Sequence, residues 1–384
     1  MLLKRIWLGN LGGLRLVMLL AVGGLLLIGL ASIYATGQIV FFNKQVVWIG
    51  VGLGAFFAVN LIPYRKMGQV SYPLFGLTLI LLVIVLAGKY VHLPAIVPMR
   101  NYAYRWIKIG PLQLQPSEMA KLTYLLALVW YLRHREGYRN LRGLVGPFML
   151  TLLPMVLILL EPDLGTTLLF PPILFAVLFI AGARVKHLLT FLLLGLLISP
   201  VMYLVMKPYQ QTRIQSLLYQ NSDDPYWLSG PGYHLHQSKI CIGSGQVTGQ
   251  GWKQGIFVNS RKSLPERHND FIFSLIAHQW GFLGCLVVLG LYILIILGGV
   301  EIAAHQTDPF GRLLALGIAA LFAVQMIINV GMTMGLTPIT GMTLPFISYG
   351  GSSLLSSFLA LGLLVNVARF HPRQIGRRSF EFQD

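Results

Sequence analysis

One heptapeptide, Leu264-Pro-Glu-Arg-His-Asn-Asp270, brings two acids, an arginine and a histidine together just before a strongly apolar run that starts at Phe271. A carboxylate at such a boundary is partly removed from water, which raises its pKa toward that of a useful general base. Arg267 and His268 carry the charge that anionic substrate groups require. The alternative interpretation is an aspartate that only caps the following helix. The crowding of this segment favours acid–base chemistry, with Asp270 as the base.

Three further charged residues have both a structural and a chemical interpretation. Glu118 and Lys121 are three residues apart on one helix face, and we expect them to pair because an unpaired charge inside a membrane is costly. The start Pro116-Ser117-Glu118 is also typical of an acid placed at a helix N-terminus. Asp163 lies in the hairpin Glu161-Pro-Asp-Leu-Gly165, where we expect it to cap the next helix.

Other searches for catalytic motifs fail. The stretch Gly243-Ser-Gly-Gln-Val-Thr-Gly-Gln-Gly251 lacks the Gly-Lys-Ser/Thr of a nucleotide-binding loop, and no HExxH or GxSxG motif occurs. Cys241 and Cys285 are far apart and show no zinc-ligand spacing. These observations argue against ATP use, serine hydrolysis and catalytic zinc.

The composition indicates which elements position these groups. Of 384 residues, 55% are hydrophobic and 11% are charged, and the mean hydropathy is +0.70, whereas soluble domains are roughly 25% charged. Apolar runs long enough to cross a bilayer core of about 30 Å recur throughout the chain. We predict an all-α polytopic membrane protein forming a single membrane domain over 1–384, with about ten spans near 14–35, 45–63, 70–88, 116–133, 144–161, 165–182, 186–206, 270–299, 310–334 and 346–370.

The charge distribution predicts the orientation. Of the Lys and Arg residues, 16 fall in the short loops and ends on one side, and five fall in the short loops on the other. The positive-inside rule then places both termini in the cytoplasm, with a cytoplasmic tail over 371–384. The loop 207–269, between helices 7 and 8, faces outward. The net charge of +17 follows this loop pattern, so no nucleic-acid partner is predicted.

The long loop is unusual for a helical bundle, because about 60 residues far exceed what a connection between two spans needs. It contains several aromatic residues and the glycine-rich stretch noted above, so we expect it to be partly ordered against the membrane. No internal repeat is visible, which weakens a transporter interpretation.

Five collinear segments closely resemble the SEDS family (shape, elongation, division and sporulation) of peptidoglycan glycosyltransferases, and the resemblance covers nearly the whole chain. The Pro-Glu-Arg-His form is more similar to the elongation members than to the division members. The segments are Arg105-Trp106 with Leu114-Gln-Pro-Ser-Glu-Met-Ala-Lys121, Glu161-Pro-Asp-Leu-Gly-Thr-Thr167, Gln237-Ser-Lys-Ile-Cys-Ile-Gly-Ser-Gly245, Leu264-Pro-Glu-Arg-His-Asn-Asp-Phe-Ile-Phe273 and Leu344-Pro-Phe-Ile-Ser-Tyr-Gly-Gly-Ser-Ser353.

The resemblance implies that lipid II, an undecaprenyl-pyrophosphate disaccharide-pentapeptide, is polymerised with inversion at the outer face of the inner membrane. Asp270 matches the essential aspartate of the family and would act as general base. A divalent cation, Mg²⁺ or Mn²⁺, could supply further positive charge. Five residues would bind the substrate and its pyrophosphate: Arg105, Gln237, Lys239, Arg267 and His268. Glu118, Lys121 and Asp163 match positions that line the outward cavity and would support its geometry.

The resemblance also implies partners and leaves two alternative functions open. We expect a class B penicillin-binding protein, because no periplasmic transpeptidase domain is found in the sequence, together with other elongation-complex proteins and the lipid-linked glycan. The alternatives are a lipid II flippase and a non-catalytic activator of a transpeptidase. Two departures from the family pattern are His278-Gln279, where an acidic pair is usual, and Asn269, where threonine is common.

Overall fold

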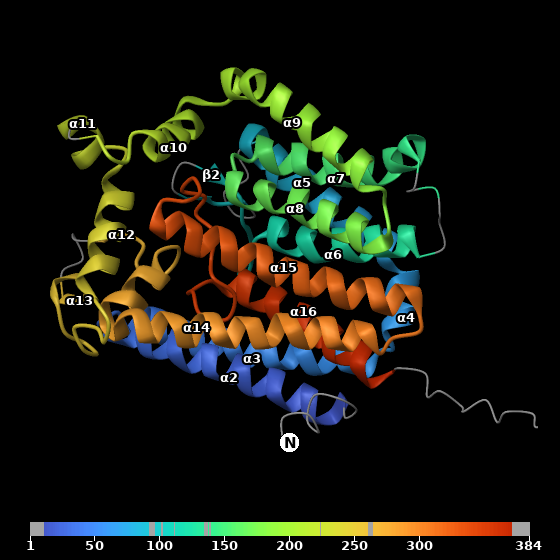
Figure 1. Ribbon diagram of the computed structural model, residues 1–384, viewed down its shortest axis with the longest axis horizontal. Helices are drawn as coiled ribbons and strands as arrows, with labels where there is room; N and C mark the ends of the chain where they lie inside the picture. Colours follow the sequence, from blue (N-terminus) through green and yellow to red (C-terminus); the bar gives the residue numbers. More distant parts are fainter. Residues whose placement is uncertain are drawn as a thin grey trace, which may run out of the picture.

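We describe the protein from a computed structural model, over residues 11–91, 97–100, 103–110, 112–133, 137, 140–222, 224–259 and 264–370. The predicted tail 371–384 lies outside the described residues. Within them the chain is a helical bundle with two small hairpins (Figure 1). The elements are α2 (Leu11–Ala35), α3 (Ile39–Leu61), α4 (Tyr64–Gln69), α5 (Ser71–Val91), β1 (Met99–Arg100), β2 (Ala103–Tyr104), β3 (Ile107–Ile109), β4 (Leu112–Leu114), α6 (Pro116–Leu132), α7 (Leu141–Leu160), α8 (Leu164–Ala181), α9 (Val185–Val205), α10 (Pro208–Leu218), α11 (Pro225–Ser229), α12 (Tyr233–Ser244), α13 (Ile256–Asn259), α14 (Ile272–Ala304), α15 (Pro309–Met334) and α16 (Gly351–Arg369).

Nine helices of the described chain are long and apolar enough to cross a membrane. The remaining expected span, 116–133, corresponds to α6, whose 17 residues are at the lower end of the roughly 17–25 residues that a crossing requires. The spans therefore agree with the predicted multi-pass fold. The largest shift is at α3, which starts six residues before the expected 45. Helix α14 ends five residues after the expected 299, and α16 starts five residues after the expected 346 because the preceding segment forms turns.

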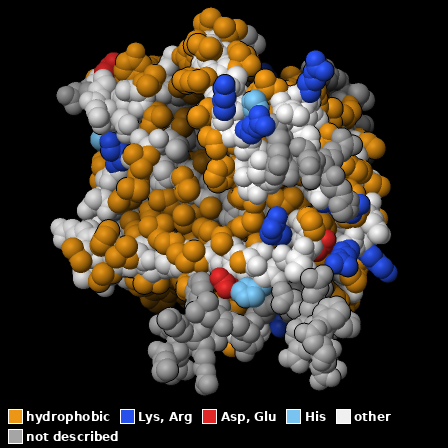
Figure 2. Space-filling view, turned by 45° about the vertical axis from the view of Figure 1, so that its right-hand side comes forward, with side chains coloured by type: hydrophobic (Ala, Val, Ile, Leu, Met, Phe, Trp, Pro, Cys, Tyr) orange, Lys and Arg blue, Asp and Glu red, His pale blue; other side chains and the backbone are white. Residues whose placement is uncertain are grey.

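The bundle has a buried centre and an apolar outside. Helices α14, α15 and α16 run through the middle, with α2 and α3 on one side and α5 to α8 on the other (Figure 1). Helix α9 lies outermost, and most of its side chains are exposed. Figure 2 shows hydrophobic side chains over much of one face, including a hollow, while most of the visible Lys and Arg side chains lie in its right half. This separation is expected of a membrane protein with one basic side.

The long loop between α9 and α14 is partly ordered, as expected, and about half of it is helical. It contains the four short helices α10 to α13, and α12 packs against α14 and α15. The connection between α5 and α6 forms two antiparallel hairpins, β1–β2 and β3–β4, which the sequence did not predict. Both connections lie at the end of the bundle where the candidate site is found.

Helix α14 is 33 residues long and is broken at Gly281, whose φ of 63° and ψ of −160° are not helical. Two helical hydrogen bonds are missing at this break. They would run from the N–H of Phe282 to the carbonyl of His278 and from the N–H of Leu283 to the carbonyl of Gln279. The glycine-rich loop replaces both bonds: the Phe282 and Leu283 N–H groups donate to Gln246 and Val247 carbonyls (2.9 and 3.1 Å). In return the N–H groups of residues 250 and 251 donate to the carbonyls of His278 and Gln279 (2.9 and 3.1 Å). The segment 282–304 is roughly 34 Å long, which suffices to cross the bilayer.

Gly249→Ala is expected to disrupt this junction and to lower the stability of the protein by about 2 kcal/mol or more. Gly249 has a φ of +88°, where a side chain costs about 1–2 kcal/mol, and its Cβ would lie 2.2 Å from the carbonyl oxygen of Gln279. Thermal unfolding in detergent should show the loss, and the amides of Phe282 and Leu283 should exchange faster with solvent. Gly243→Ala is the control, because that glycine is in α12 with nothing within 4 Å of an added Cβ. Equal stability of the two variants would contradict the prediction.

Candidate functional site

Asp270 lies in a tight turn two residues before α14, where two other segments fix its backbone. Asn329 of α15 donates its side-chain amide to the Asp270 carbonyl (3.0 Å), and the Ser348 hydroxyl donates to the Asn269 carbonyl (2.7 Å). The side chain is partly buried. Burial, then the nearby charge of Glu266, raises the pKa of Asp270 from 3.8 to about 7, although nearby arginines oppose the shift. The expected partial desolvation is therefore present, and the carboxylate is able to accept a proton near neutral pH.

Arg213 of α10 flanks the same space as Asp270. A Cβ at Gly341, whose φ is +72°, would lie 3.3 Å from the Asp270 Oδ2 and 3.7 Å from the Arg213 Nη1. The distance between the Asp270 Oδ2 and the Arg213 Nη1 is therefore no greater than the sum of these two values. Arg213 is held in place by donating from Nη1 to the carbonyl of Thr340 (3.2 Å). A glycine at 341 keeps the space between acid and arginine open.

The hairpin between α7 and α8 holds a second arginine next to this space. Arg105, between β2 and β3, donates to the carbonyl oxygens of Glu161 (3.1 Å) and of Pro162. The hydroxyl of Tyr209, on α10, donates to the same Pro162 carbonyl (2.8 Å). The hairpin thus joins the segment before α6 to α10. The charge of Arg105 acts on both Arg213 and Asp270.

Asp163 caps α8, as the sequence predicted. Its carboxylate accepts from the backbone N–H of Thr166 (3.3 Å) and the hydroxyl of Thr166 (3.0 Å). It also accepts from the side chains of Gln115 (3.0 Å) and Ser117 (3.1 Å), which flank the start of α6. The acid is 6% exposed. Asp163 therefore fixes the ends of two helices at the rim of the site.

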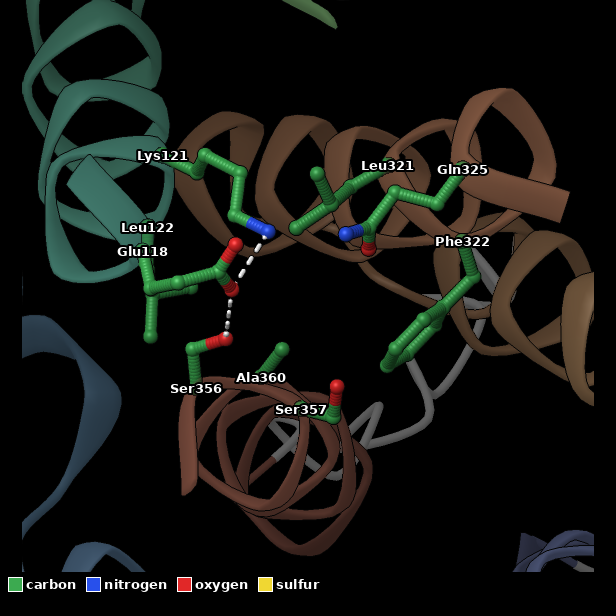
Figure 3. Close-up of a pocket in the computed structure, with 9 residues that line it drawn as sticks. All are labelled: Glu118, Lys121, Leu122, Leu321, Phe322, Gln325, Ser356, Ser357 and Ala360. Atoms are coloured by element: carbon green, nitrogen blue, oxygen red, sulfur yellow. Dashed lines mark hydrogen bonds and ion pairs between the residues drawn. The ribbon is translucent and has the colours of Figure 1, made fainter. Parts of the chain in front are cut away.

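Glu118 and Lys121 form the expected ion pair, with 2.7 Å between Glu118 Oε2 and Lys121 Nζ. The Ser356 hydroxyl of α16 donates to the same carboxylate oxygen (3.2 Å). The pair lies in a small cavity between α6, α15 and α16, beside the amide of Gln325 (Figure 3). Both charged residues are buried. The prediction that they support an outward cavity is not tested by this contact.

Arg267 and His268, two other predicted binding residues, contact α13 and the segments at the end of α2 and the start of α3. Arg267 is 2% exposed, and its guanidinium donates to the carbonyls of Phe257 and Thr36. The ring of His268 stacks on Phe41, with centroids 4.3 Å apart. These contacts hold the turn before α14 against the ends of α2 and α3.

Lys239 and Gln237 lie on α12. The Lys239 ammonium approaches the side-chain oxygens of Gln220 (3.4 Å) and Asn221 (3.3 Å), and Gln237 is partly exposed. No His, Cys, Asp or Glu residues in the described part of the chain come together in a group of three that could hold a metal ion.

Sequence reasoning missed Arg213 and Tyr209. Arg213 is the single charged residue of α10, a short helix directly after the seventh predicted span. A lone cation on a short polar helix at the membrane surface is the signal that could have identified it. Its proximity to Asp270 depends on Gly341, more than 100 residues away in the sequence, and local pattern does not reveal such contacts.

Comparison with known proteins agrees with this architecture. Residues 13–373 match the family described as cell cycle protein, which groups FtsW, RodA and SpoVE. The peptidoglycan glycosyltransferase RodA of Treponema pallidum is 32% identical, over 90% of this chain and 94% of its own. The probable peptidoglycan glycosyltransferase FtsW of Trichlorobacter lovleyi is 34% identical, over 92% of each chain.

Among solved structures, a chain from "Structural coordination of polymerization and crosslinking by a peptidoglycan synthase complex" is 32% identical, with a TM-score of 0.76. The match covers 92% of this chain and 96% of that one. Family, relatives and fold agree over almost the whole length. The chain is a multi-pass membrane protein and belongs to the SEDS family of peptidoglycan glycosyltransferases.

Proposed function

We propose that this glycosyltransferase polymerises lipid II into β-1,4-linked glycan strands at the outer face of the inner membrane, with Asp270 as general base. The observation that carries the proposal is a partly buried carboxylate with a pKa of about 7, facing a space that also receives an arginine. Such a pair supplies a proton acceptor and a stabiliser of negative charge at one place.

In the proposed step the 4-hydroxyl of one lipid II sugar attacks the anomeric carbon of the growing strand. The new C–O bond forms as the bond from that carbon to the pyrophosphate breaks, and its electron pair leaves on the phosphate oxygen. The hydroxyl proton passes to Asp270, and configuration inverts from α to β. One base is sufficient because the leaving group needs charge stabilisation rather than a proton, and Arg105 is close enough to contribute.

We also propose the cellular setting. Both termini would lie in the cytoplasm and the Asp270 end of the bundle in the periplasm, as the distribution of Lys and Arg indicates. The Pro-Glu-Arg-His segment supports a role in elongation, although the relatives include both FtsW and RodA. The structurally similar chain belongs to a peptidoglycan synthase complex that coordinates polymerisation with crosslinking, which supports a class B penicillin-binding protein as partner.

The experiment that tests the function uses purified protein in lipid vesicles with fluorescent lipid II, with and without the transpeptidase partner. Separation of the products on a gel should reveal a ladder of glycan strands. A flippase would instead move the headgroup across vesicles and form no strands. Complete absence of strands under both conditions, with translocation present, would overturn the proposal in favour of the flippase.

The rate of polymerisation is expected to rise with pH and to level off above about pH 7. Because the base must be ionised, kcat/KM should fall about tenfold per pH unit below the raised pKa of Asp270. Glu266 raises that pKa, whereas Arg213 and Arg105 lower it. Glu266→Gln should therefore shift the acid limb to lower pH and leave the plateau unchanged. A profile flat from pH 5 to 8 in the wild-type protein would exclude Asp270 as the base.

A further inference from the structure

Arg105 and Arg213 are two cations that are not neutralised by a neighbouring acid. Neither makes an ion pair within 4.0 Å among the described residues, since the ion pairs found there involve other side chains. Both are partly buried. Tyr209 connects them: its hydroxyl donates to the Pro162 carbonyl that also accepts from Arg105, and the Arg213 guanidinium lies 6.0 Å from the centroid of its ring. Burial, then the charge of Arg105, lowers the pKa of Arg213, as expected of two neighbouring cations. Two like charges that are partly removed from water are unfavourable unless an anion between them compensates their charge.

Besides Asp270, which faces Arg213 across the space at Gly341, two acids lie near these arginines, and neither forms an ion pair with them among the described residues. The carboxylate of Asp163 accepts hydrogen bonds from its own helix and from the start of α6. Glu161 is 2% exposed, and neither of its carboxyl oxygens has a hydrogen-bond partner among the described residues. Burial, with the charge of Asp163 second, raises the pKa of Glu161 to about 9, so it is neutral at pH 7. The arginines thus retain most of their positive charge.

Both guanidinium groups are also held in orientation by backbone carbonyls. Arg105 uses Nε and one terminal nitrogen for the carbonyls of Glu161 and Pro162, which leaves its other terminal nitrogen free of these bonds. Arg213 uses Nη1 for Thr340 and keeps two further donor nitrogens. Planar guanidinium forks held in this way suit a group with several phosphate oxygens, and little side-chain entropy is lost on binding.

We infer that Arg213 and Arg105 together form a diphosphate-binding site next to Asp270, with Arg213 of α10 as a specific binding residue for the lipid-linked leaving group. The inference rests on the proposed function and deepens it by naming the residues that bind the diphosphate. One arginine would bind each phosphate, and the anomeric carbon would face the open space at Gly341, within reach of the base. This geometry stabilises the negative charge that develops as the bond breaks.

Arg213→Gln tests the inference through binding as well as turnover. Farnesyl diphosphate and farnesyl monophosphate are titrated into the purified full chain in detergent, and affinity is measured by thermophoresis. We expect the wild-type protein to bind the diphosphate more tightly than the monophosphate, and more weakly as salt increases. Arg213→Gln should reduce diphosphate affinity about tenfold or more. Arg213→Lys should be intermediate, because the charge remains but the planar fork is lost.

Arg184→Gln is the matched control, since that exposed arginine at the start of α9 makes no capping hydrogen bond and lies at the far end of the helix. Diphosphate binding unchanged in Arg213→Gln would overturn the inference, as would equal wild-type affinity for both lipids. Should Arg213→Gln not fold, the Lys variant and the salt dependence decide. Asp270→Asn should still bind the diphosphate, so loss of polymerisation with binding intact separates the proposed function from this site.

Discussion

Asp270→Asn is expected to reduce glycan polymerisation by at least about a hundredfold, since a positioned general base contributes roughly 10²–10⁴ in rate. The asparagine keeps the shape of the side chain but cannot accept the hydroxyl proton. The loss should appear in kcat at saturating lipid II, measured from the length and amount of strands on a gel. Binding of substrate should change little, because the arginines that meet its diphosphate are untouched.

The variant should remain folded, and this makes the result interpretable. The raised pKa of Asp270 means that the folded protein holds this proton more tightly than the unfolded chain. The folded state therefore loses stability as pH rises from about 4 to about 7, and at pH 8 the ionised acid opposes folding. Asparagine removes that cost, so the variant should melt no lower than the wild-type protein.

Asp224→Asn is the matched control for the loss of one carboxylate from the same loop. Asp224 caps α11 by accepting from the N–H of Tyr226 (2.9 Å), and asparagine can make the same bond. This variant should polymerise normally. Strand synthesis at the wild-type rate by Asp270→Asn would refute the role of Asp270, and loss of headgroup translocation without any polymerisation in the wild-type protein would favour a flippase.

Local sequence patterns predicted those features that depend on residues close together in the sequence. Apolar runs set the spans because backbone groups inside a bilayer must be satisfied within a helix. The Asp163 cap and the Glu118–Lys121 pair were predictable since their partners lie three residues away. The segment before α14 was singled out because charged groups crowd around Asp270.

Contacts between distant segments could not be predicted in this way. Arg267 and His268 are next to Asp270 in sequence, and the structure shows that their side chains contact Phe257, Thr36 and Phe41, which lie on other segments. The charge pattern of the heptapeptide does not reveal these partners. Arg213 reaches Asp270 only because the fold brings α10 to the segment around Gly341.

The break in α14 was also not foreseen. The run from 270 to 299 read as one uninterrupted span, although Gly281 carries a backbone conformation that ends the first part of the helix. The long loop that contains the glycine-rich stretch was recognised as unusual, but the contact of this stretch with α14 was not predicted. Its glycines are required because the loop backbone approaches the carbonyl of Gln279 too closely for a side chain at 249. Such close approach of two backbones is a tertiary property.

Lys121→Met is expected to lower the stability of the protein by about 3–5 kcal/mol, because it leaves the buried Glu118 carboxylate without its cation. The Ser356 hydroxyl, 3.2 Å from that carboxylate, compensates only partly. Thermal unfolding in detergent should show a large fall in melting temperature. Arg65→Gln is the control, since the Arg65 side chain is mostly exposed and its ion pair with Asp308 contributes under about 1 kcal/mol.

The double variant Glu118→Gln with Lys121→Met separates a structural role from an electrostatic one. Removing both charges eliminates the unpaired carboxylate, so most of the lost stability should return. If the pair only holds α6 against α16, polymerisation should return with stability. If its charges shape the cavity, the double variant should be stable and slow, with a raised KM for lipid II. A Lys121→Met protein as stable as the wild type would refute the burial argument, because an uncompensated charge among α6, α15 and α16 cannot be neutral in its effect.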